Sequence, residues 1–390
     1  EEMIMSIGKL RSATSLILAT ILVSCTTPSF VNADVSVNPF NFLLESNSPR
    51  AIAMGGCAIN SVTPESPLSN PAALGLFHLD HLASVNFPNS SKLLSGLGVN
   101  DLRFRTWGVS GGSSLKSLKN ADSLPINFSV GLSYAYRKTD YGTIYLTKEY
   151  AGAIDSFEAY DEMNYLSAGI GVEIHRFLRI GVGYSYRILE FLSMPASSFG
   201  WGKLKGNTHD YGFIAQVRVH ELARRKSALS QPNSHRLQLE LIPSYAMVKI
   251  NDGGSMSYEN GPGPFPFGME ATNSGASIFA SLDLNAARLV SVYWTQKANS
   301  RTSIQSHGME FGLADMLFYR FGRSGSSGHS ETKGAGISLG GLMAWLEEWG
   351  KLDTEHSSVH RFMRKLDIRY DYAEREGLDK FHKLTLSLLQ

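Results

Sequence analysis

Apolar side chains recur at every second position through long stretches of this sequence, which predicts an all-β protein: a single antiparallel transmembrane β-barrel of about 14 strands. In one such stretch, Phe128, Val130 and Leu132 are separated by Ser129 and Gly131. A strand sends successive side chains to opposite faces, so one face is apolar and the other is small or polar. An apolar N-terminal segment and aromatic residues gathered near strand ends are the two other observations behind this prediction.

The expected strands have the length that crosses a bilayer, about 9–11 residues when tilted. An even number of strands places both ends of the barrel on one side of the membrane. The candidate strands are 82–87, 102–110, 126–137, 164–175, 178–190, 208–220, 235–250, 275–284, 289–297, 304–312, 316–323, 333–345, 364–373 and 381–389.

The connections between these strands fall into two classes, as expected for short periplasmic turns and longer external loops. Tight links are expected at 176–177, 285–287 and 313–315, and long polar loops at 138–163, 191–207 and 251–274. The links that are longer than a barrel requires on the turn side are 111–125, 221–234 and 346–363.

Aromatic residues are expected at one level of the wall, near the external interface, where amphipathic rings favour the headgroup region. The strands of a soluble β-sandwich also alternate apolar and polar side chains, but such a protein needs neither export nor aromatic residues at one end of successive strands. The aromatic residues in question are Tyr134, Tyr136, Tyr165, Tyr184, Tyr186, Tyr211, Tyr293, Trp294, Tyr370, Tyr372 and Phe381.

Residues 1–33 have the organisation of a signal peptide. Basic residues precede an apolar run over 16–23, and small residues lead to a cleavage position after Ala33. A lipobox-like sequence ending at Cys25 is the alternative, and it would leave a lipidated mature N-terminus. Cleavage after Ala33 leaves Cys57 as the remaining cysteine, which excludes an internal disulfide bond. The predicted location is the bacterial outer membrane.

Composition excludes several classes of function. The formal net charge is +1, and basic and acidic residues are interspersed, so nucleic acid is not an expected partner. Beyond the N-terminal segment there is no apolar run of ~18 residues, which argues against a second membrane helix. Barrel strands do not produce such runs, because only alternate residues face lipid.

Two motifs before the first strand resemble those of the long-chain fatty-acid outer-membrane transporters (FadL-like), and most closely the PorV/PorQ branch associated with type IX secretion. The first is the Arg-Ala-x-x-Met-Gly-Gly stretch at 50–56, and the second is Asn70-Pro71-Ala72. Further likenesses to this family occur at 209–212, 309–322 and 334–337.

This resemblance implies that 34–80 folds as an N-terminal luminal plug inside a barrel formed by 81–390. A barrel of this strand number has a bore too wide for wall side chains to fill, so an internal segment is physically reasonable. The candidate plug and lumen residues are Arg50, Met54, Gly55, Gly56, Asn70, Pro71 and Ala72.

Charged and polar residues at the non-lipid positions of the predicted strands are candidates for the lumen lining. Arg50 of the plug is expected to pair with one of three carboxylates, those of Glu173, Asp283 or Glu310. The full set of predicted lumen-facing polar residues is Glu173, Arg179, Arg187, Gln216, Arg218, Asp283 and Glu310.

The sequence contains two partial matches to catalytic or metal-binding motifs, and each lacks an essential part. The stretch 108–112 matches G-x-S-x-G, but a nucleophile elbow needs a strand-to-helix turn with an acid and a His downstream. His356 and His360 have helical i, i+4 spacing without the Glu of a metalloprotease motif. The sequence predicts no catalytic residue, no metal site and no cofactor.

Two functional hypotheses from different classes follow. In the first, the barrel carries a hydrophobic small molecule, such as a fatty acid, through a plugged lumen, by uptake or by export. In the second, it is an outer-membrane shuttle or scaffold of type IX secretion, and 138–163 and 251–274 contact secretion-system proteins and cargo. Outer-membrane lipid is a partner in both hypotheses.

Overall fold

The computed structural model describes most of the expected barrel and part of the segment that precedes it. The described residues are 48–79, 81–92, 103–114, 126–148, 151–192, 202–219, 237–261, 263–266, 268, 270–284, 287–301, 305–324, 330–348, 365–375 and 380–389. The predicted signal peptide, both cleavage alternatives, His356 and His360 lie outside these residues, as does the beginning of the predicted plug.

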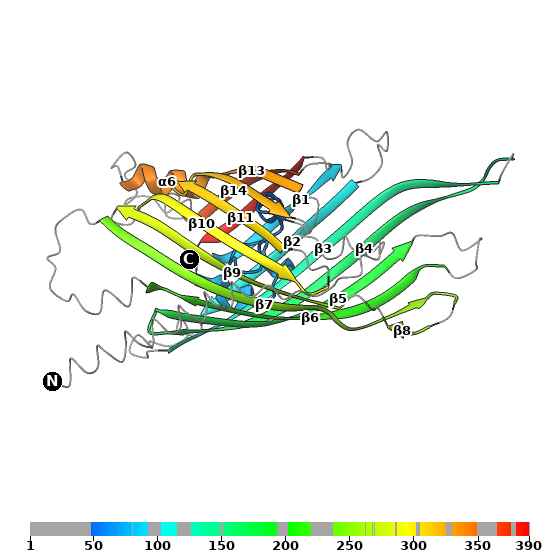
Figure 1. Ribbon diagram of the computed structural model, residues 1–390, viewed down its shortest axis with the longest axis horizontal. Helices are drawn as coiled ribbons and strands as arrows, with labels where there is room; N and C mark the ends of the chain where they lie inside the picture. The colour runs from blue at the N-terminus through cyan, green and yellow to red at the C-terminus, as the bar shows by residue number, and fades with distance from the viewer. Residues whose placement is uncertain are drawn as a thin grey trace.

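The described strands form one closed antiparallel barrel (Figure 1). Strands that follow one another along the chain are paired, β15 pairs with β1, and the β6–β7 pairing closes the sheet. The sheet has 15 strands, of which the two-residue β8 (Phe265–Pro266) pairs with β7 alone; the other 14 form the wall. These are β1 (His81–Lys92), β2 (Arg103–Ser114), β3 (Ile126–Lys148), β4 (Ala151–Ile174), β5 (Leu178–Leu192), β6 (Leu204–Val217), β7 (Leu237–Tyr258), β9 (Ala271–Leu284), β10 (Ala287–Asn299), β11 (Gln305–Leu313), β12 (Leu317–Ser324), β13 (Ser330–Ser338), β14 (Leu366–Arg375) and β15 (Phe381–Leu389).

The alternation in sequence corresponds to the two faces of this wall, and the predicted fold class is confirmed. In β3, Phe128 and Leu132 are 49% and 63% exposed on the outer face, whereas Ser129 is buried on the inner face. Val182 on β5 is likewise exposed on the outer face. Exposed apolar side chains around a closed wall form a surface far larger than the apolar patch of a soluble protein. Hydrocarbon is the environment that suits such a surface.

Each predicted strand has its counterpart, but several boundaries differ. The predicted loop 138–163 is largely a hairpin, because β3 and β4 remain paired out to Lys148 and Ala151 and project well beyond their neighbours (Figure 1). Half of 251–274 is also strand, at the end of β7 and the start of β9. The tight links predicted at 176–177 and 313–315 are observed as turns at 175–177 and 314–316; both turns include non-glycine residues with positive φ.

The prediction of a strand over 333–345 is wrong in its second half. β13 ends at Ser338, and helix α6 (Leu339–Glu348) follows at the turn end of the barrel. Ser338 Oγ donates to Asp367 Oδ1 at 2.8 Å, and the backbone N–H of Gly340 donates to the same oxygen at 3.0 Å. The second of these bonds satisfies a backbone donor of the first helical turn. Apolar residues suit either structure, so their pattern did not indicate the change.

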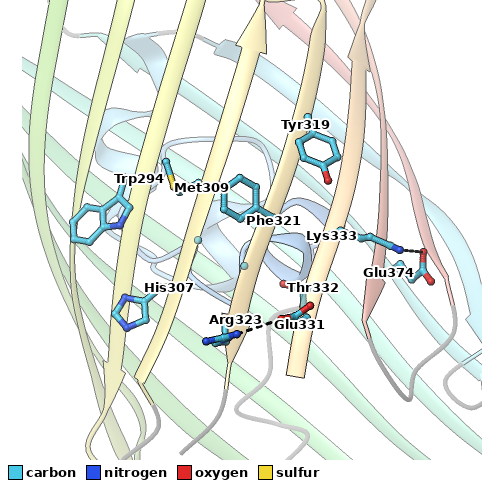
Figure 2. A pocket seen from close by; sticks show the side chains of 12 residues that line it. Trp294, His307, Met309, Tyr319, Phe321, Arg323, Glu331, Thr332, Lys333 and Glu374 are labelled. Atoms are coloured by element: carbon cyan, nitrogen blue, oxygen red, sulfur yellow. Dashed lines mark hydrogen bonds and ion pairs between the residues drawn. The ribbon is translucent and has the colours of Figure 1, made fainter. Parts of the chain in front are cut away.

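The aromatic residues divide between the two faces of the wall. On the outer face, Trp107 packs on Tyr134 with ring centroids 5.3 Å apart, and Tyr184 packs on Tyr211 at 5.5 Å. Another group borders a cavity on the outer face of β10 to β14 (Figure 2). Three predicted interfacial rings instead point into the bore and are buried: Tyr165, Tyr293 and Phe381. Their predicted place was wrong because their alternation parity is that of the inner face.

Residues 48–79, here called the luminal segment, lie inside the barrel (Figure 1). Their short helices are α2 (Pro49–Ala53), η2 (Ser66–Leu68), α3 (Ala73–Leu76) and η3 (Phe77–Leu79). Helix α2 contacts β12 to β15, whereas α3 contacts β2 to β5 on the opposite side. The segment therefore crosses the bore. Of the helices in the described part of the chain, none is long and apolar enough to pass through a bilayer.

Candidate functional site

The luminal segment begins with a capped helical turn against β12 to β14. Ser48 Oγ accepts the backbone N–H of Ala51 at 3.4 Å, and Pro49 occupies the first helical turn, where its missing N–H costs nothing. Gly55 and Gly56 then end the helix with φ of 70° and 82°. Side chains rarely adopt this left-handed conformation, and a Cβ at Gly55 would also meet wall backbone, so glycine is required there.

Met54, also predicted as a lumen residue, is fully buried against the wall. Its neighbours on the wall are Gly308 and Gly322, where any added Cβ would overlap Met54 atoms. The backbone N–H of Gly55 donates to Thr332 Oγ1 at 3.1 Å, and that hydroxyl donates to the carbonyl of Ala53 at 2.9 Å. This part of the luminal segment lies directly on the strand backbone, without side chains between.

Asn70 joins two parts of the luminal segment to the wall. Its amide nitrogen donates to the carbonyl of Ile59 at 2.9 Å and to that of Phe213 on β6 at 3.2 Å. Its side-chain oxygen accepts the backbone N–H of Ala72 at 3.0 Å, and this bond shapes the turn at Pro71. Asn70 and Ala72 are both fully buried. A buried amide satisfied in this way orders the chain around it.

A glycine patch on the inner face of β3 to β6 receives the second half of the luminal segment. Side chains at these positions would overlap atoms of 70–76, in several cases backbone atoms that cannot move aside. Strand glycines commonly mark such close approach. The patch consists of Gly131, Gly169, Gly171, Gly181, Gly183 and Gly212.

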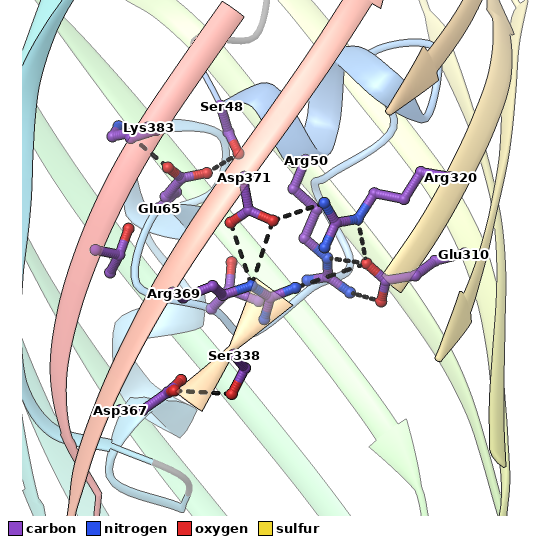
Figure 3. Close-up of polar contacts among 12 residues, drawn as sticks. Ser48, Arg50, Glu65, Glu310, Arg320, Ser338, Asp367, Arg369, Asp371 and Lys383 are labelled. Carbon is purple, nitrogen blue, oxygen red and sulfur yellow. Dashed lines mark hydrogen bonds and ion pairs between the residues drawn. The ribbon is translucent and has the colours of Figure 1, made fainter. Parts of the chain in front are cut away.

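An ion network ties Arg50 to the inner face of β11, β12 and β14 (Figure 3). Arg50 donates through Nε and Nη2 to the two oxygens of Glu310, each at 2.8 Å. Arg320 Nη1 donates to Asp371 Oδ1 at 2.6 Å, and Arg320 Nε donates to Glu310. Arg369 Nε lies 3.2 Å from Asp371 Oδ2. Among the predicted carboxylates it is therefore Glu310 that contacts Arg50.

This lumen ion network (Arg50, Glu310, Arg320, Arg369 and Asp371) holds three cations against two carboxylates in a buried site. Burial by itself lowers the pKa of Arg50, but Glu310 outweighs it and raises that pKa above its ordinary value. Buried ions are costly unless they are paired and hydrogen-bonded. The position of Arg50 thus depends on the carboxylates of the wall.

A second buried ion pair lies beside this network. Lys383 Nζ on β15 is 3.2 Å from Glu65 Oε1, and Ser48 Oγ donates to the other oxygen of Glu65. Burial raises the pKa of Glu65, with Lys383 acting in the opposite direction. Each of the two ionic contacts involves a different part of the luminal segment, so both parts are held on the same side of the bore.

The remaining predicted lumen residues form local pairs. Arg179 Nε donates to Glu173 at 3.0 Å, and Gln216 occupies the register position opposite Arg179 on β6. Near the same turn end, Arg218 Nη2 donates to Glu240 at 2.7 Å. Each of these charges is compensated by its neighbour.

The other two predicted residues lie apart from that group. Asp283 is 3.4 Å from Arg288 at the turn end. Arg187 is buried higher in the bore, where it pairs with Asp210 and donates to Asn251 Oδ1 at 3.1 Å. Each of these two residues thus has an oppositely charged partner within the bore.

An apolar lumen cluster occupies the inner face of β3 to β7 toward the external end. Leu68 of the luminal segment packs against it. Arg187 borders it, with its guanidinium carbon 5.0 Å from the centre of the Tyr165 ring. The cluster consists of Ala135, Met163, Tyr165, Leu189, Phe191, Leu204 and Met256, all buried. Barrel interiors are ordinarily polar, so an apolar inner face is an unusual feature.

Cys57 is a buried free thiol within the luminal segment. Desolvation raises the pKa of this thiol to about 12. Thiolate is the reactive form of cysteine, so a buried thiol with this pKa is inert toward alkylating reagents. Its reactivity therefore reports whether the luminal segment is in place.

We expect a maleimide to label Cys57 in the folded barrel far more slowly than in the urea-unfolded chain, at least ~100-fold more slowly at pH 8. The unfolded thiol ionises first as pH rises, so raised pH stabilises the unfolded chain. Stability is accordingly retained at lower pH and lost progressively above about pH 9. Mass spectrometry of labelled protein, with a Cys25→Ser background where the leader is retained, measures the rate. Equal rates in the two states would show that the thiol is accessible.

Several residues of the site escaped the sequence-based reasoning. Arg320, Asp371 and Lys383 stand at inward positions of predicted strands, where a charge has no contact with lipid. Their inward position in the alternation of each strand was the sequence feature that could have identified them. For the apolar lumen cluster the strand pattern gave a misleading signal, because apolar residues occupy both faces in the external half of β4 and β5.

Among the residues that the structure describes, the G-x-S-x-G match forms no catalytic arrangement and no metal site is found. Ser110 of the G-x-S-x-G match lies within β2, and its Oγ donates to Ser133 Oγ at 3.0 Å. A strand interior lacks the sharp turn that exposes a nucleophile. In the described ranges no group of three or more His, Cys, Asp or Glu side chains is placed to hold a metal ion.

Comparison with known proteins finds likeness in solved structures. The chain is similar to the Pseudomonas putida toluene transporter TodX, at 14% identity, covering 88% of this chain and 97% of that one, with a TM-score of 0.39. It is similar to the Ralstonia pickettii toluene transporter TbuX, at 11% identity, covering 90% and 100%, with a TM-score of 0.44. It is also similar to a Pseudomonas aeruginosa FadL homologue, at 12% identity, covering 88% of this chain and 97% of that one, with a TM-score of 0.38. No protein-family model and no curated protein matches the sequence.

Proposed function

We propose that this protein is an outer-membrane barrel that passes a hydrophobic small molecule, such as a fatty acid, through a bore occupied by the luminal segment. The observation that carries this proposal is the apolar lumen cluster. A barrel that conducts water and hydrophilic solutes lines its bore with polar groups. Apolar side chains facing inward have no role in such a pore, but they form a favourable surface for an apolar ligand.

Because Leu68 packs against the apolar lumen cluster, this apolar surface leads from the external end of the bore to the luminal segment. An apolar molecule entering from the external end meets Met163, Phe191 and Met256 first and then reaches the luminal segment. Below that contact, Ile59 and Leu76 pack on the inner face of β6, β7 and β9. The apolar lumen cluster thus reaches the luminal segment at Leu68, and a second, separate apolar cluster packs that segment on the wall.

The luminal segment acts as a plug in this proposal. Its attachments on the β11 to β15 side are ionic, through Arg50 and Glu65, whereas α3 packs on the glycine patch by close backbone contact. Ion pairs can be exchanged for other partners or for water, so the ionic side is where we place the movement that opens a path. The direction of transport, uptake or export, is set by the gradient of the ligand.

The proposed location rests on the wall and on the N-terminal sequence. The outer face is apolar around a closed barrel, and the predicted signal peptide would deliver the chain to the periplasm. A folded barrel migrates differently from its heat-unfolded form in a detergent gel. Heat-modifiable migration of the membrane fraction therefore tests the location without reference to the ligand.

A charge placed in the apolar lumen cluster is expected to reduce transport. Phe191→Asp should lower uptake of radiolabelled oleate by cells about tenfold or more, because an apolar ligand cannot satisfy a carboxylate in its path. Phe191→Leu, which keeps the surface apolar, is the matched control and should remain within about twofold of the parent, given the small cost of conservative apolar exchanges. Unchanged uptake by a correctly folded Phe191→Asp barrel would count against the proposed path.

A second candidate function, a scaffold or shuttle for secreted proteins in type IX secretion, is favoured by the external β3–β4 hairpin. This hairpin stands well clear of the neighbouring strands (Figure 1), where a protein partner can reach it. Shortening the hairpin between Tyr141 and Tyr160 tests the idea. Loss of co-purifying secretion components with unchanged oleate uptake would favour the scaffold, whereas recovery of none from the parent barrel argues against it.

A further inference from the structure

An outward-facing cavity lies on the side of the wall opposite to the lumen ion network. It spans the outer face of β10 to β14 and has a volume of about 810 Å³. This is within the range of about 300–1,000 Å³ found for small-ligand sites. Figure 2 shows the side chains around it on the outer surface, with the luminal segment behind the strands. The cavity therefore opens toward the surrounding medium of the barrel rather than toward its bore.

The half of the cavity nearer the middle of the wall is apolar. Trp294, Met309, Tyr319 and Phe321 surround it. The Phe321 ring stacks on that of Phe311 with centroids 5.9 Å apart, which continues the apolar surface along the strands. Backbone of the inner-facing Gly308 and Gly322 contributes to the lining, so the surface is hollow between the larger side chains.

Charged groups lie at the external end of the cavity and along its β13–β14 side. Arg323 Nη2 lies 3.2 Å from Glu331, and Lys333 Nζ lies 3.6 Å from Glu374. These ion pairs are exposed: the side chains of Arg323 and Lys333 retain 53% and 62% of their accessible surface. Exposed ion pairs contribute little to stability, so their cations readily exchange partners. His307 lies at the same end of the cavity.

We propose that this cavity binds a phosphorylated lipid of the outer leaflet. Its acyl chain lies against Trp294, Met309 and Phe321, and its phosphate is held by Arg323 and Lys333. Arg323 lies beyond Phe321 toward the external end of β12, which matches a membrane lipid whose acyl chain is deeper than its phosphate. Lys333 lies beside Phe321 in register and approaches the phosphate from the flank. A phosphate takes both cations from carboxylates that remain solvated, and a guanidinium binds phosphate through parallel hydrogen bonds.

This inference goes beyond the transport role, because the cavity and the bore lie on opposite faces of the wall. It shares with that role only the placing of the barrel in the outer membrane. A soluble ligand does not fit the same observations, since the apolar half lies on the exposed wall that faces hydrocarbon. The charged groups also distinguish the cavity from the part of the outer surface of β3 where Phe128, Val130 and Leu132 follow one another.

Native mass spectrometry of the full-length barrel in detergent tests the proposal, with bis-phosphorylated lipid A as the probe. The double variant Arg323→Ala/Lys333→Ala should raise the Kd about tenfold, because two charge-assisted contacts are lost. Lys205→Ala is the matched control: its ammonium is also exposed, 3.0 Å from Glu259, but it lies on β6, away from the cavity. This control should leave the Kd unchanged.

A second probe separates headgroup recognition from simple apolar adhesion. Diacylglycerol, which lacks phosphate, should bind the parent barrel at least ~10-fold more weakly than lipid A. Equal binding of both lipids, or an equal loss in the Lys205→Ala control, would overturn the proposal. Oleate uptake by the double variant should stay at the parental level, so failure here and failure of the transport role can be told apart.

Discussion

Replacing Glu310 by Gln is expected to release the luminal segment from the wall on the β11 to β14 side. Glu310 accepts both hydrogen bonds of Arg50 and one from Arg320, and it lies 3.8 Å from Arg369. Without its charge, three buried guanidinium groups share the single carboxylate of Asp371. Removing one member of a buried ionic group costs about 3–5 kcal/mol, far more than the loss of an exposed pair.

The rate of maleimide labelling at Cys57 measures this release in the folded barrel. A cost of about 3 kcal/mol or more corresponds to a rate increase of at least ~100-fold if labelling follows opening. Glu259→Gln, which breaks the exposed pair with Lys205, serves as the control and should label like the parent. Parental labelling of a folded Glu310→Gln barrel would mean that Arg50 does not hold the segment.

Gly183→Val on β5 is expected to displace the other half of the luminal segment. A Cβ at this position would overlap the carbonyl group of Pro71 and the backbone nitrogen of Ala72. Backbone cannot rotate away as a flexible side chain can, so the overlap must be relieved by movement of α3 off the wall. Overpacking of this kind costs about 1–3 kcal/mol or more.

Ion conductance in planar bilayers reports the result, since a displaced segment leaves the bore open to water. The Gly183→Val barrel should conduct, whereas the parent should conduct little. Gly111→Val on β2 is the control, because Gly111 faces outward and the nearest atom to an added Cβ is the carbonyl oxygen of Leu82 at 3.6 Å. Conductance that is equal in the two variants would show that the close contact at Gly183 does not position the segment.

The wall could be predicted from the sequence because the type of each strand residue, apolar or polar, reflects whether its side chain faces lipid or the lumen. Phe128 and Leu132 are outside and Ser129 is inside for a reason that depends only on neighbouring positions of one strand. The same parity predicted Glu310, Arg187 and Asp283 as inward residues. Tyr165, Tyr293 and Phe381 have the same inward parity and are buried, so it is their assignment to the outer interface as aromatic residues that is wrong.

Other features depend on partners that are distant in the sequence. Helix α6 begins after Ser338 with help from Asp367, which the local apolar pattern of 339–346 cannot reveal. The ion network joins Arg50 to residues more than 250 positions away. The carboxylate that Arg50 contacts is decided by the order of the strands around the barrel and by the path of the luminal segment.

By itself, the sequence determined the closed antiparallel wall, its number of strands, the apolar outer face and the presence of a glycine- and proline-marked segment ahead of the first strand. The physical reason is that hydrocarbon on one face and the lumen on the other impose a period of two on every strand. Only the tertiary structure decided that Arg50 meets Glu310, that glycines of four strands admit α3, and that Leu68 packs against the apolar lumen cluster. Those contacts arise when the barrel closes, because closure alone brings strands and luminal segment together at fixed register.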